Sequence, residues 1–321
     1  MKRALSNILD ASVVGGFSRI GYEVRSRLGS FVDIASLDLS GRRFVVTGPT
    51  SGLGLETSSM LARAGADLVL VGRDESRTVV AAEKVDALGA GEVSYVVCDM
   101  GDLQSVASAS RTITTGGAVH ALVDNAGALT HERLLTAQGF ESTVATQVLG
   151  PHLMTRLLVD TVAASAGRIV TVSSGGMYSA DLPRVAGERT LEMNELQYNG
   201  TRQYAIAKRA QVVLNEMWAG ARPDVHFAAM HPGWADTPGV KSSLPTFRTL
   251  TRPLLRTPRQ GADTIAWLAA ADTLPAPSGS FWCDREPRSI HKTASSRATD
   301  TPDRRRDLWN WCDSVTAPFA G

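Results

Sequence analysis

Tyr204 and Lys208 are the residues whose types and spacing most directly suggest chemistry. They lie four positions apart in a stretch with helical character, so their side chains share one face of a helix. A phenol with its ordinary pKa of about 10 exchanges protons poorly at neutral pH, and an ammonium one turn away is expected to lower that pKa. Ser174 follows an apolar run and supplies a hydroxyl that can hold a substrate oxygen while Tyr204 transfers a proton. The alternative is a surface pair, because isolated Tyr and Lys with this spacing are frequent.

A glycine-rich loop supplies the first element that must position these side chains. The loop lies between the apolar run 44–46 and a helical pattern over 55–64, which gives the order strand, loop, helix. Glycines let the backbone turn tightly, and a helix that starts here directs unpaired N–H groups at an anion. The loop therefore predicts a dinucleotide-phosphate site formed by Gly48, Thr50, Ser51, Gly52, Leu53 and Gly54.

The residue after the second expected strand bears on the choice of cofactor. A nucleotide fold that prefers NAD usually has a carboxylate there, whereas this chain has Gly72 followed by Arg73. Arginine binds phosphate through a planar, permanently charged fork, so Arg73 favours NADP(H). The alternative is a solvated arginine paired with Asp74 or Glu75.

Two further strand ends extend the expected nucleotide site. Asp99, with Met100, follows the third strand, and its carboxylate can accept from the exocyclic amine of adenine; a helix-leading acid is the alternative. Asn125, Ala126 and Gly127 follow the fourth strand, and the two small residues allow a ligand to approach the backbone.

The alternation of strands and helices predicts an α/β fold, a Rossmann-type doubly wound parallel sheet of about seven strands with helices on both faces. In such a sheet, ligands bind at the carboxyl ends of the strands, where the residues above fall. The expected strands cover 44–47, 67–71, 93–98, 119–123, 168–172, 225–230 and 279–283. The expected helices cover 55–64, 76–88, 102–113, 138–164, 203–219 and 260–271.

The chain divides into an N-terminal helical arm over 1–40, a single sheet domain over 41–285 and a C-terminal tail over 286–321. Apolar residues of the arm recur near helical spacing, which favours packing on the domain; a peripheral membrane or partner-binding helix is the alternative. The segment 284–306 has no apolar periodicity and is expected to be mobile, whereas Trp309 and Trp311 beyond it could dock on the domain.

Composition excludes several classes of function. The 321 residues carry a formal net charge of +1, which gives no reason to expect nucleic acid as a partner. The three cysteines are widely spaced and neither they nor the histidines show metal-ligand spacing, so no metal site is expected. Unpaired cysteines favour a reducing, cytoplasmic location.

Taken together and in order, these motifs resemble those of the short-chain dehydrogenases/reductases over about residues 40–285. A closer resemblance to one subgroup of that family rests on the segments 172–177, 204–214, 231–240 and 260–264. The resemblance implies hydride transfer between a nicotinamide and a carbonyl or alcohol carbon, with Tyr204 as general acid or base, Lys208 on the ribose and Ser174 on the substrate oxygen. It also implies that Pro232, Gly233 and Thr237 contact the nicotinamide carboxamide.

The chain departs from the family pattern at Gln147, where members usually have an asparagine that supports a water chain from the lysine. We expect a slower or adapted proton relay and treat Gln147 as a catalytic residue. Asp124 replaces the first asparagine of the usual Asn-Asn-Ala-Gly, a milder change.

Three stretches are expected to determine the substrate: 131–135, 175–203 and 238–258. Their apolar members predict a hydrophobic carbonyl or alcohol, the alternative being that they only pack the loops: Met177, Leu182, Trp234, Leu244, Phe247 and Leu250. A cofactor-binding sensor or scaffold without turnover is the competing function. A homodimer through the long helices stays open, as do the substrate and the direction of reaction.

Overall fold

The computed structural model describes residues 9, 12–186 and 190–321. Within them, eight strands form one sheet in the order β3-β2-β1-β4-β5-β6-β7-β8. Each neighbouring pair is parallel except β7 and β8, which are antiparallel. The strands are β1 Arg43–Thr47, β2 Asp67–Gly72, β3 Val93–Val97, β4 Ala121–Asp124, β5 Arg168–Val172, β6 His226–Met230, β7 Phe281–Cys283 and β8 Glu286–Arg288. The predicted doubly wound parallel sheet is confirmed, and β1 lies beside both β2 and β4, where the strand order reverses.

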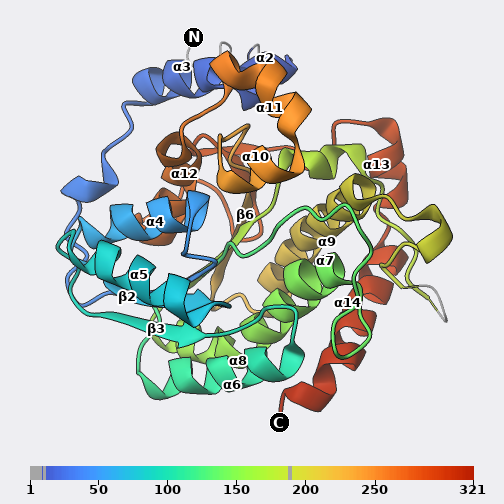
Figure 1. Cartoon of the computed structure of the whole chain (residues 1–321), viewed down its shortest axis with the longest axis horizontal. Coiled ribbons are helices and arrows are strands. Elements are labelled where there is room, and N and C mark those ends of the chain that lie inside the picture. Colours follow the sequence, from blue (N-terminus) through green and yellow to red (C-terminus); the bar gives the residue numbers. More distant parts are fainter. Residues whose placement is uncertain (1–8, 10–11, 187–189) are drawn as a thin grey trace.

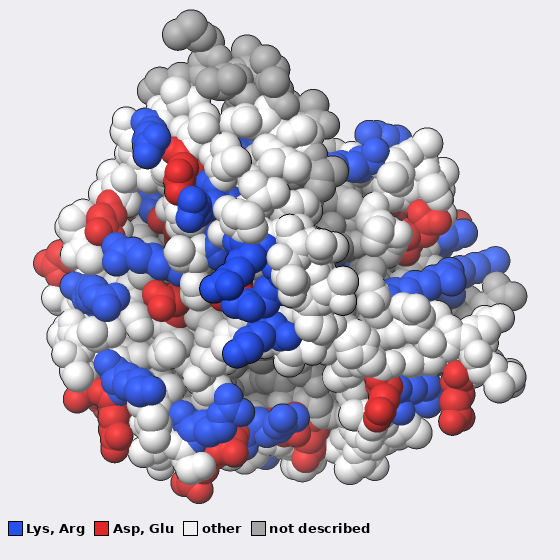
Figure 2. Space-filling view, turned by 45° about the horizontal axis from the view of Figure 1, so that its top comes forward, with Lys and Arg blue, Asp and Glu red and all other residues white. Residues whose placement is uncertain are grey.

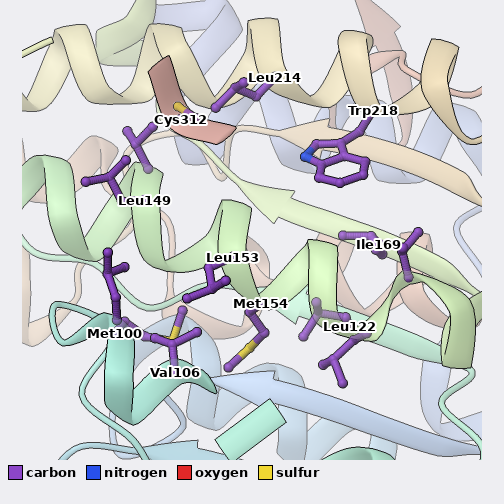
Figure 3. Close-up of a cluster of buried hydrophobic side chains, with 14 of the residues drawn as sticks. Met100, Val106, Leu122, Leu149, Leu153, Met154, Ile169, Leu214, Trp218 and Cys312 are labelled. Carbon is purple, nitrogen blue, oxygen red and sulfur yellow. The ribbon is translucent and has the colours of Figure 1, made fainter. Parts of the chain in front are cut away.

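Helices cover both faces of this sheet (Figure 1). On one face α4, α5 and α12 bury a core against β1 and β2, and on the other α6, α8, α9 and α14 bury a second core. Figure 3 shows this second core between the helices and the sheet, with Leu153 and Met154 of α8 above Leu122 of β4. The helices are α2 Val13–Phe17, α3 Arg19–Gly29, α4 Gly52–Ala62, α5 Glu75–Asp86, α6 Leu103–Thr115, α7 Ser142–Val144, α8 Gly150–Ala164, α9 Gly200–Ala221, α10 Pro238–Ser243, α11 Pro245–Thr251, α12 Pro258–Ala270, α13 Ala294–Thr299 and α14 Pro302–Thr316.

The eighth strand was not predicted because its turn lacks the usual signal. Two-residue hairpin turns of type I′ require positive φ at both positions and favour Asn-Gly or Asp-Gly. Here Asp284 and Arg285 take φ values of 53° and 56°. Both side chains are held by buried ion pairs, Arg285 with Asp263 and Asp284 with Arg256, so tertiary contacts stabilise a conformation that the sequence does not favour.

The C-terminal segment differs from the expected mobile tail. Residues 286–288 form β8, and α13 and α14 pack on the domain. Leu308 and Cys312 lie one turn apart on α14 and are fully buried in the second core, while Trp309 meets Trp218 edge to face at 4.8 Å. The expected docking of Trp309 is therefore found. The apolar stripe of α14 is short and is surrounded by polar residues, so the sequence pattern did not indicate it.

One long helix expected over 138–164 is divided in the structure. Glu141 caps α7 by accepting from the backbone of Thr143 and Val144, and a π-helical segment, Ala145–Leu149, separates α7 from α8. Gly139, with φ of 83°, precedes the cap, so the helix cannot begin at 138. No helix of the described residues is both long and apolar enough to cross a membrane.

Candidate active site

The glycine loop, which follows β1, is hydrogen-bonded to the residues after β4. Thr47 accepts through Oγ1 from the backbone N–H groups of Asn125 and Ala126, both at 2.9 Å. Asn125 donates through Nδ2 to the carbonyl oxygens of Thr47 at 2.8 Å and Gly48 at 3.2 Å. The side chain of Asn125 therefore holds the loop in place, and a direct contact with a nucleotide would have to come from its neighbours.

The loop conformation requires its glycines. Gly48 and Gly52 have φ values of 67° and 56°, and a Cβ on Gly54 would lie 2.2 Å from the carbonyl oxygen of Gly48. Ser51 is the N-cap of α4 but makes no side-chain capping bond. The backbone N–H groups in the first turn of α4 are therefore available to bind a ligand. These features fit the phosphates of a dinucleotide. Thr50 and Leu53 are partly exposed in the same loop.

The loop after β6 reaches the glycine loop from the other side. A Cβ on Gly52 would lie 3.3 Å from Cβ of Thr237, whose hydroxyl caps α10. Pro232 accepts through its carbonyl from Arg256 at 3.1 Å, and Gly233 has φ of 71°. The structure thus brings the two expected cofactor loops together.

Arg73 is exposed directly after β2. Asp74 is engaged in capping α5, where it accepts from the backbone of Arg77 at 2.9 Å and from the hydroxyl of Ser76 at 2.8 Å. Arg73 forms no hydrogen bond or salt bridge with another residue of the described ranges, and its interaction with Asp74 is a minor Coulombic one beside the capping bonds that lower the pKa of that carboxyl. Figure 2 shows further Lys and Arg side chains gathered near the middle of the face on which α2, α3, α10 and α11 lie.

The two residues after β3 differ in orientation. Asp99 is partly exposed, and its Oδ1 accepts from the backbone of Gly101 at 2.9 Å. Met100 is 4% exposed and its side chain packs in the second core near Val106 (Figure 3). Only the backbone of Met100 is therefore available for a cofactor.

Ser174, Tyr204 and Lys208 converge at the carboxyl end of β5. The Ser174 hydroxyl lies close enough to the Tyr204 phenol to lower its pKa, and its Oγ accepts from the backbone N–H of Gly176 at 3.1 Å. Lys208 Nζ lies 5.4 Å from the centroid of the Tyr204 ring and donates to the carbonyl oxygen of Val172 at 2.9 Å. A Cβ on Gly176 would lie 3.8 Å from the Tyr204 ring, so glycine keeps this side of the pair open.

Burial dominates the protonation behaviour of Tyr204 and Lys208. Burial raises the pKa of Tyr204, and the nearby Ser174 hydroxyl opposes that rise only in part. Burial also lowers the pKa of Lys208 to about 7. In this structure burial is the largest influence on the pKa of both groups, so the lowering of the Tyr204 pKa by the Lys208 ammonium stays a prediction.

Gln147 lies in the π-helical segment and is fully buried. Its side-chain Nε2 donates to the carbonyl oxygen of Ala128 at 2.7 Å. Its backbone carbonyl accepts from the side-chain Nε2 of Gln211 at 2.7 Å. A Cβ on Gly127 would lie 3.0 Å from the Gln147 side chain, so the two pack tightly. The structure does not bring Gln147 into hydrogen-bond contact with Lys208 within the described residues.

A cavity of about 30 Å³ lies behind the site, between the sheet and α8 and α9. Its lining includes Asp124, Gln147, Gln211 and Asn215, each with a buried side-chain oxygen that has no partner among the described residues. A polar space of this size holds a water molecule. Burial raises the pKa of Asp124 to about 8, so its carboxyl is protonated at neutral pH.

Replacing Asp124 by asparagine is expected to remove a pH dependence of stability. The folded-state pKa of about 8 exceeds the ordinary value, so Asp124 binds a proton in the folded chain that the unfolded chain has lost, and stability falls as pH rises from about 4 to 8. Urea denaturation at pH 5 and pH 8 measures the fall in the free energy of unfolding over this range. The fall should be smaller in Asp124→Asn than in the parent, by at least about 1 kcal/mol. An equal loss in both proteins would contradict the assignment.

The expected apolar wall is found only in part. Trp234 and Phe247 are partly exposed and meet edge to face at 5.3 Å. Met177 and Leu182 are fully buried and pack inside the domain, and Leu250 is 78% exposed to solvent. Met177 and Leu182 do not form the wall because their segments pack on α9 and on the C-terminal segment, whereas Leu250 faces solvent on α11. Leu244 is partly buried between α10 and α11.

Two of the three substrate stretches meet directly. His131 Nε2 lies 2.8 Å from the carbonyl oxygen of Ser243 on α10, and the Ser243 hydroxyl donates to the carbonyl of Leu129 at 2.8 Å. The helices α10 and α11 are thereby tied to the segment after β4. They form a lid segment, 238–254, that follows the expected cofactor loop.

The doubly wound sheet, its glycine loop and the grouped side chains of Ser174, Tyr204 and Lys208 are together typical of nicotinamide-dependent oxidoreductases. A model of the short chain dehydrogenase family matches residues 42–181. Bovine dehydrogenase/reductase SDR family member 12 is 38% identical over 88% of this chain and 90% of its own length. Human retinol dehydrogenase 11 is 31% identical over 92% of this chain and 93% of its own. A solved structure of an uncharacterised protein from Mycobacterium Paratuberculosis is 25% identical, with a TM-score of 0.68 over 89% of this chain and 97% of that one.

The chain belongs to the short-chain dehydrogenases/reductases, a family of oxidoreductases. The expected likeness to one subgroup is confirmed, since that subgroup is the one containing dehydrogenase/reductase SDR family member 12.

Sequence reasoning missed two residues beside the site. Phe17 of the N-terminal arm contacts the backbone after Ser174, and Arg256 contacts the backbone of Pro232. Neither lies in a motif, and the apolar spacing that favoured packing of the arm on the domain did not indicate that it reaches the strand ends.

Proposed function

We propose that this protein is an NADP(H)-dependent oxidoreductase that transfers a hydride between nicotinamide and a hydrophobic carbonyl or alcohol. The observation that supports it most is the grouping of Ser174, Tyr204 and Lys208 at the carboxyl end of β5, with Lys208 Nζ 5.4 Å from the centroid of the Tyr204 ring. This group lies at the same sheet edge as the glycine loop, where ligands bind in doubly wound folds.

Each residue has a distinct role in this proposal. The nicotinamide, when bound, supplies or accepts the hydride. Ser174 holds the substrate oxygen, and Tyr204 donates its phenolic proton in reduction and accepts one in oxidation. Lys208 binds the ribose hydroxyls, and its ammonium would then favour the phenolate and offset the effect of burial on the Tyr204 pKa. Gln147 keeps Ala128 and the small residues before it in place beside this group.

Fluorescence titration with NADPH and NADH, followed by turnover measurements on a panel of carbonyls, tests this function. Tight NADPH binding and Tyr204-dependent oxidation support it. Tight binding without turnover on any carbonyl would contradict it and favour the cofactor-binding sensor or scaffold.

Arg73→Ala is expected to weaken NADPH binding by about tenfold or more while leaving NADH binding nearly unchanged, because only NADPH carries the 2′-phosphate. Lys84→Ala is the matched control, since it removes an exposed charge from the last turn of α5, away from the end of β2. Fluorescence titration of both variants measures the effect. Equal losses for both cofactors would refute the role of Arg73.

A hydrophobic substrate is supported by the aromatic pair of Trp234 and Phe247 at the lid segment. It is also supported by the identity of 31% with a relative named retinol dehydrogenase 11. Lipophilic aldehydes, ketones and alcohols should give higher kcat/KM than small polar ones. The absence of any preference would contradict this part of the proposal.

A further inference from the structure

The N-terminal arm inserts a phenylalanine between two strand-end loops of the site. Phe17 is 7% exposed, and its ring stacks on His231 at 4.8 Å and on Trp234 at 5.8 Å. The ring also contacts the residue after Ser174, since a Cβ on Gly175 would lie 2.0 Å from Phe17 Cε1. The one ring therefore contacts the backbone after β5 and the loop after β6.

Backbone hydrogen bonds hold the arm in this position. The N–H of Trp234 donates to the carbonyl of Phe17 at 2.8 Å. The Arg256 guanidinium donates to the carbonyls of Ser18 at 3.2 Å, Gly16 at 3.4 Å and Pro232 at 3.1 Å. A single guanidinium thus bridges the arm and the expected cofactor loop.

A buried carboxylate fixes that guanidinium. Asp284 accepts from Arg256 at 2.6 and 2.9 Å and from Arg25 of α3 at 2.8 Å, and the side chains of all three are at most 1% exposed. Burial alone would raise the pKa of Asp284, but the two guanidiniums hold it below its ordinary value. Arg25 also donates to the carbonyl of Gly15 at 3.2 Å, so the two arginines together hold the carbonyls of Gly15, Gly16 and Ser18.

The aromatic contacts continue from the arm to the lid segment. Trp234, stacked on Phe17, meets Phe247 of α11 at 5.3 Å. Arg248 of α11 forms a bidentate pair with Asp236 of the same loop, at 2.6 and 2.9 Å. A displacement of Phe17 would therefore reach both the cofactor loop and the lid through direct contacts.

We propose that Phe17 is a positioning residue of the active site, through which the N-terminal arm sets the loop 231–237 and the lid segment 238–254 against Ser174. The kinetic consequences of this inference rest on the proposed function. The positioning of the two segments by Phe17 does not depend on it. The arm is then part of the catalytic unit and determines how a hydrophobic substrate is held.

The test compares Phe17→Ala with Phe17→Leu and with Ile20→Ala in the full-length protein. Ile20 is 51% exposed on α3 and serves as the control in the same arm. Amide hydrogen exchange with NADPH present should show faster exchange over 231–237 and 244–251 in Phe17→Ala, a smaller change in Phe17→Leu and none in Ile20→Ala. The Trp234 amide reports most directly, since its acceptor is the carbonyl of Phe17.

Kinetics provide the second readout. With a lipophilic carbonyl, Phe17→Ala should lower kcat/KM by about tenfold, mostly through KM, with partial recovery in Phe17→Leu. Unchanged exchange in both segments would overturn the proposal, and so would uniformly faster exchange across the whole chain. If the parent protein shows no Tyr204-dependent turnover, the proposed function fails, but the exchange experiment still decides the role of Phe17.

Discussion

Tyr204→Phe is expected to lower kcat by about 10²–10⁴-fold, the range that general acid–base catalysis contributes. The substitution removes the phenolic oxygen and leaves the ring, which packs beside Gly176 and Lys208. Cofactor affinity should change little, because the glycine loop and Arg73 are untouched. Steady-state kinetics and NADPH titration on the same preparation separate the two effects.

Tyr198→Phe is the matched control for this prediction. Tyr198 is hydrogen-bonded to Glu141 at 2.9 Å, and neither residue belongs to the Ser-Tyr-Lys group. Its kcat should stay within a few-fold of the parent value, as expected for a residue outside the reacting group. Comparable activity in Tyr204→Phe and the parent would show that another group transfers the proton.

Asp284→Ala is expected to destabilise the protein by about 3–5 kcal/mol, because it removes a buried carboxylate that pairs with two buried guanidiniums. Arg25 and Arg256 are each about 1% exposed, so water cannot replace the carboxylate. Urea denaturation measures the change in the free energy of unfolding.

Asp272→Ala provides the comparison for the buried cluster. Asp272 pairs with Arg42 at 3.6 Å, but its side chain is 95% exposed, and exposed pairs contribute at most about 1 kcal/mol. Equal unfolding midpoints for Asp284→Ala and Asp272→Ala would show that the buried cluster does not hold the arm to the domain.

The parts of the fold that sequence predicted well are those with strong local signals. Strand β5 is found as expected at Arg168–Val172, and Asp102 caps α6 by accepting from the backbone of Gln104 and Ser105. The glycine loop, Ser174, Tyr204 and Lys208 meet at one sheet edge because parallel strands place their carboxyl ends together. Their spacing along the chain was enough to predict this.

The remaining features depend on contacts between distant segments. Asp300 near the start of α14 is buried with Arg209 of α9, so a polar sequence that suggested a tail is in fact paired inside the domain. The position of Phe17 depends on Asp284, which lies far along the chain, through Arg256. The direction of the Lys208 side chain depends on a backbone carbonyl of β5 and has no local signature.

Transfer of deuterium from C4-deuterated NADPH to a carbonyl substrate is the most direct measurement of the central claim. Mass spectrometry of the product should show the label with the parent protein, and its rate of appearance should be about 10²–10⁴-fold lower with Tyr204→Phe. NADPH binding accompanied by no labelled product from any lipophilic carbonyl would contradict the proposed oxidoreductase function.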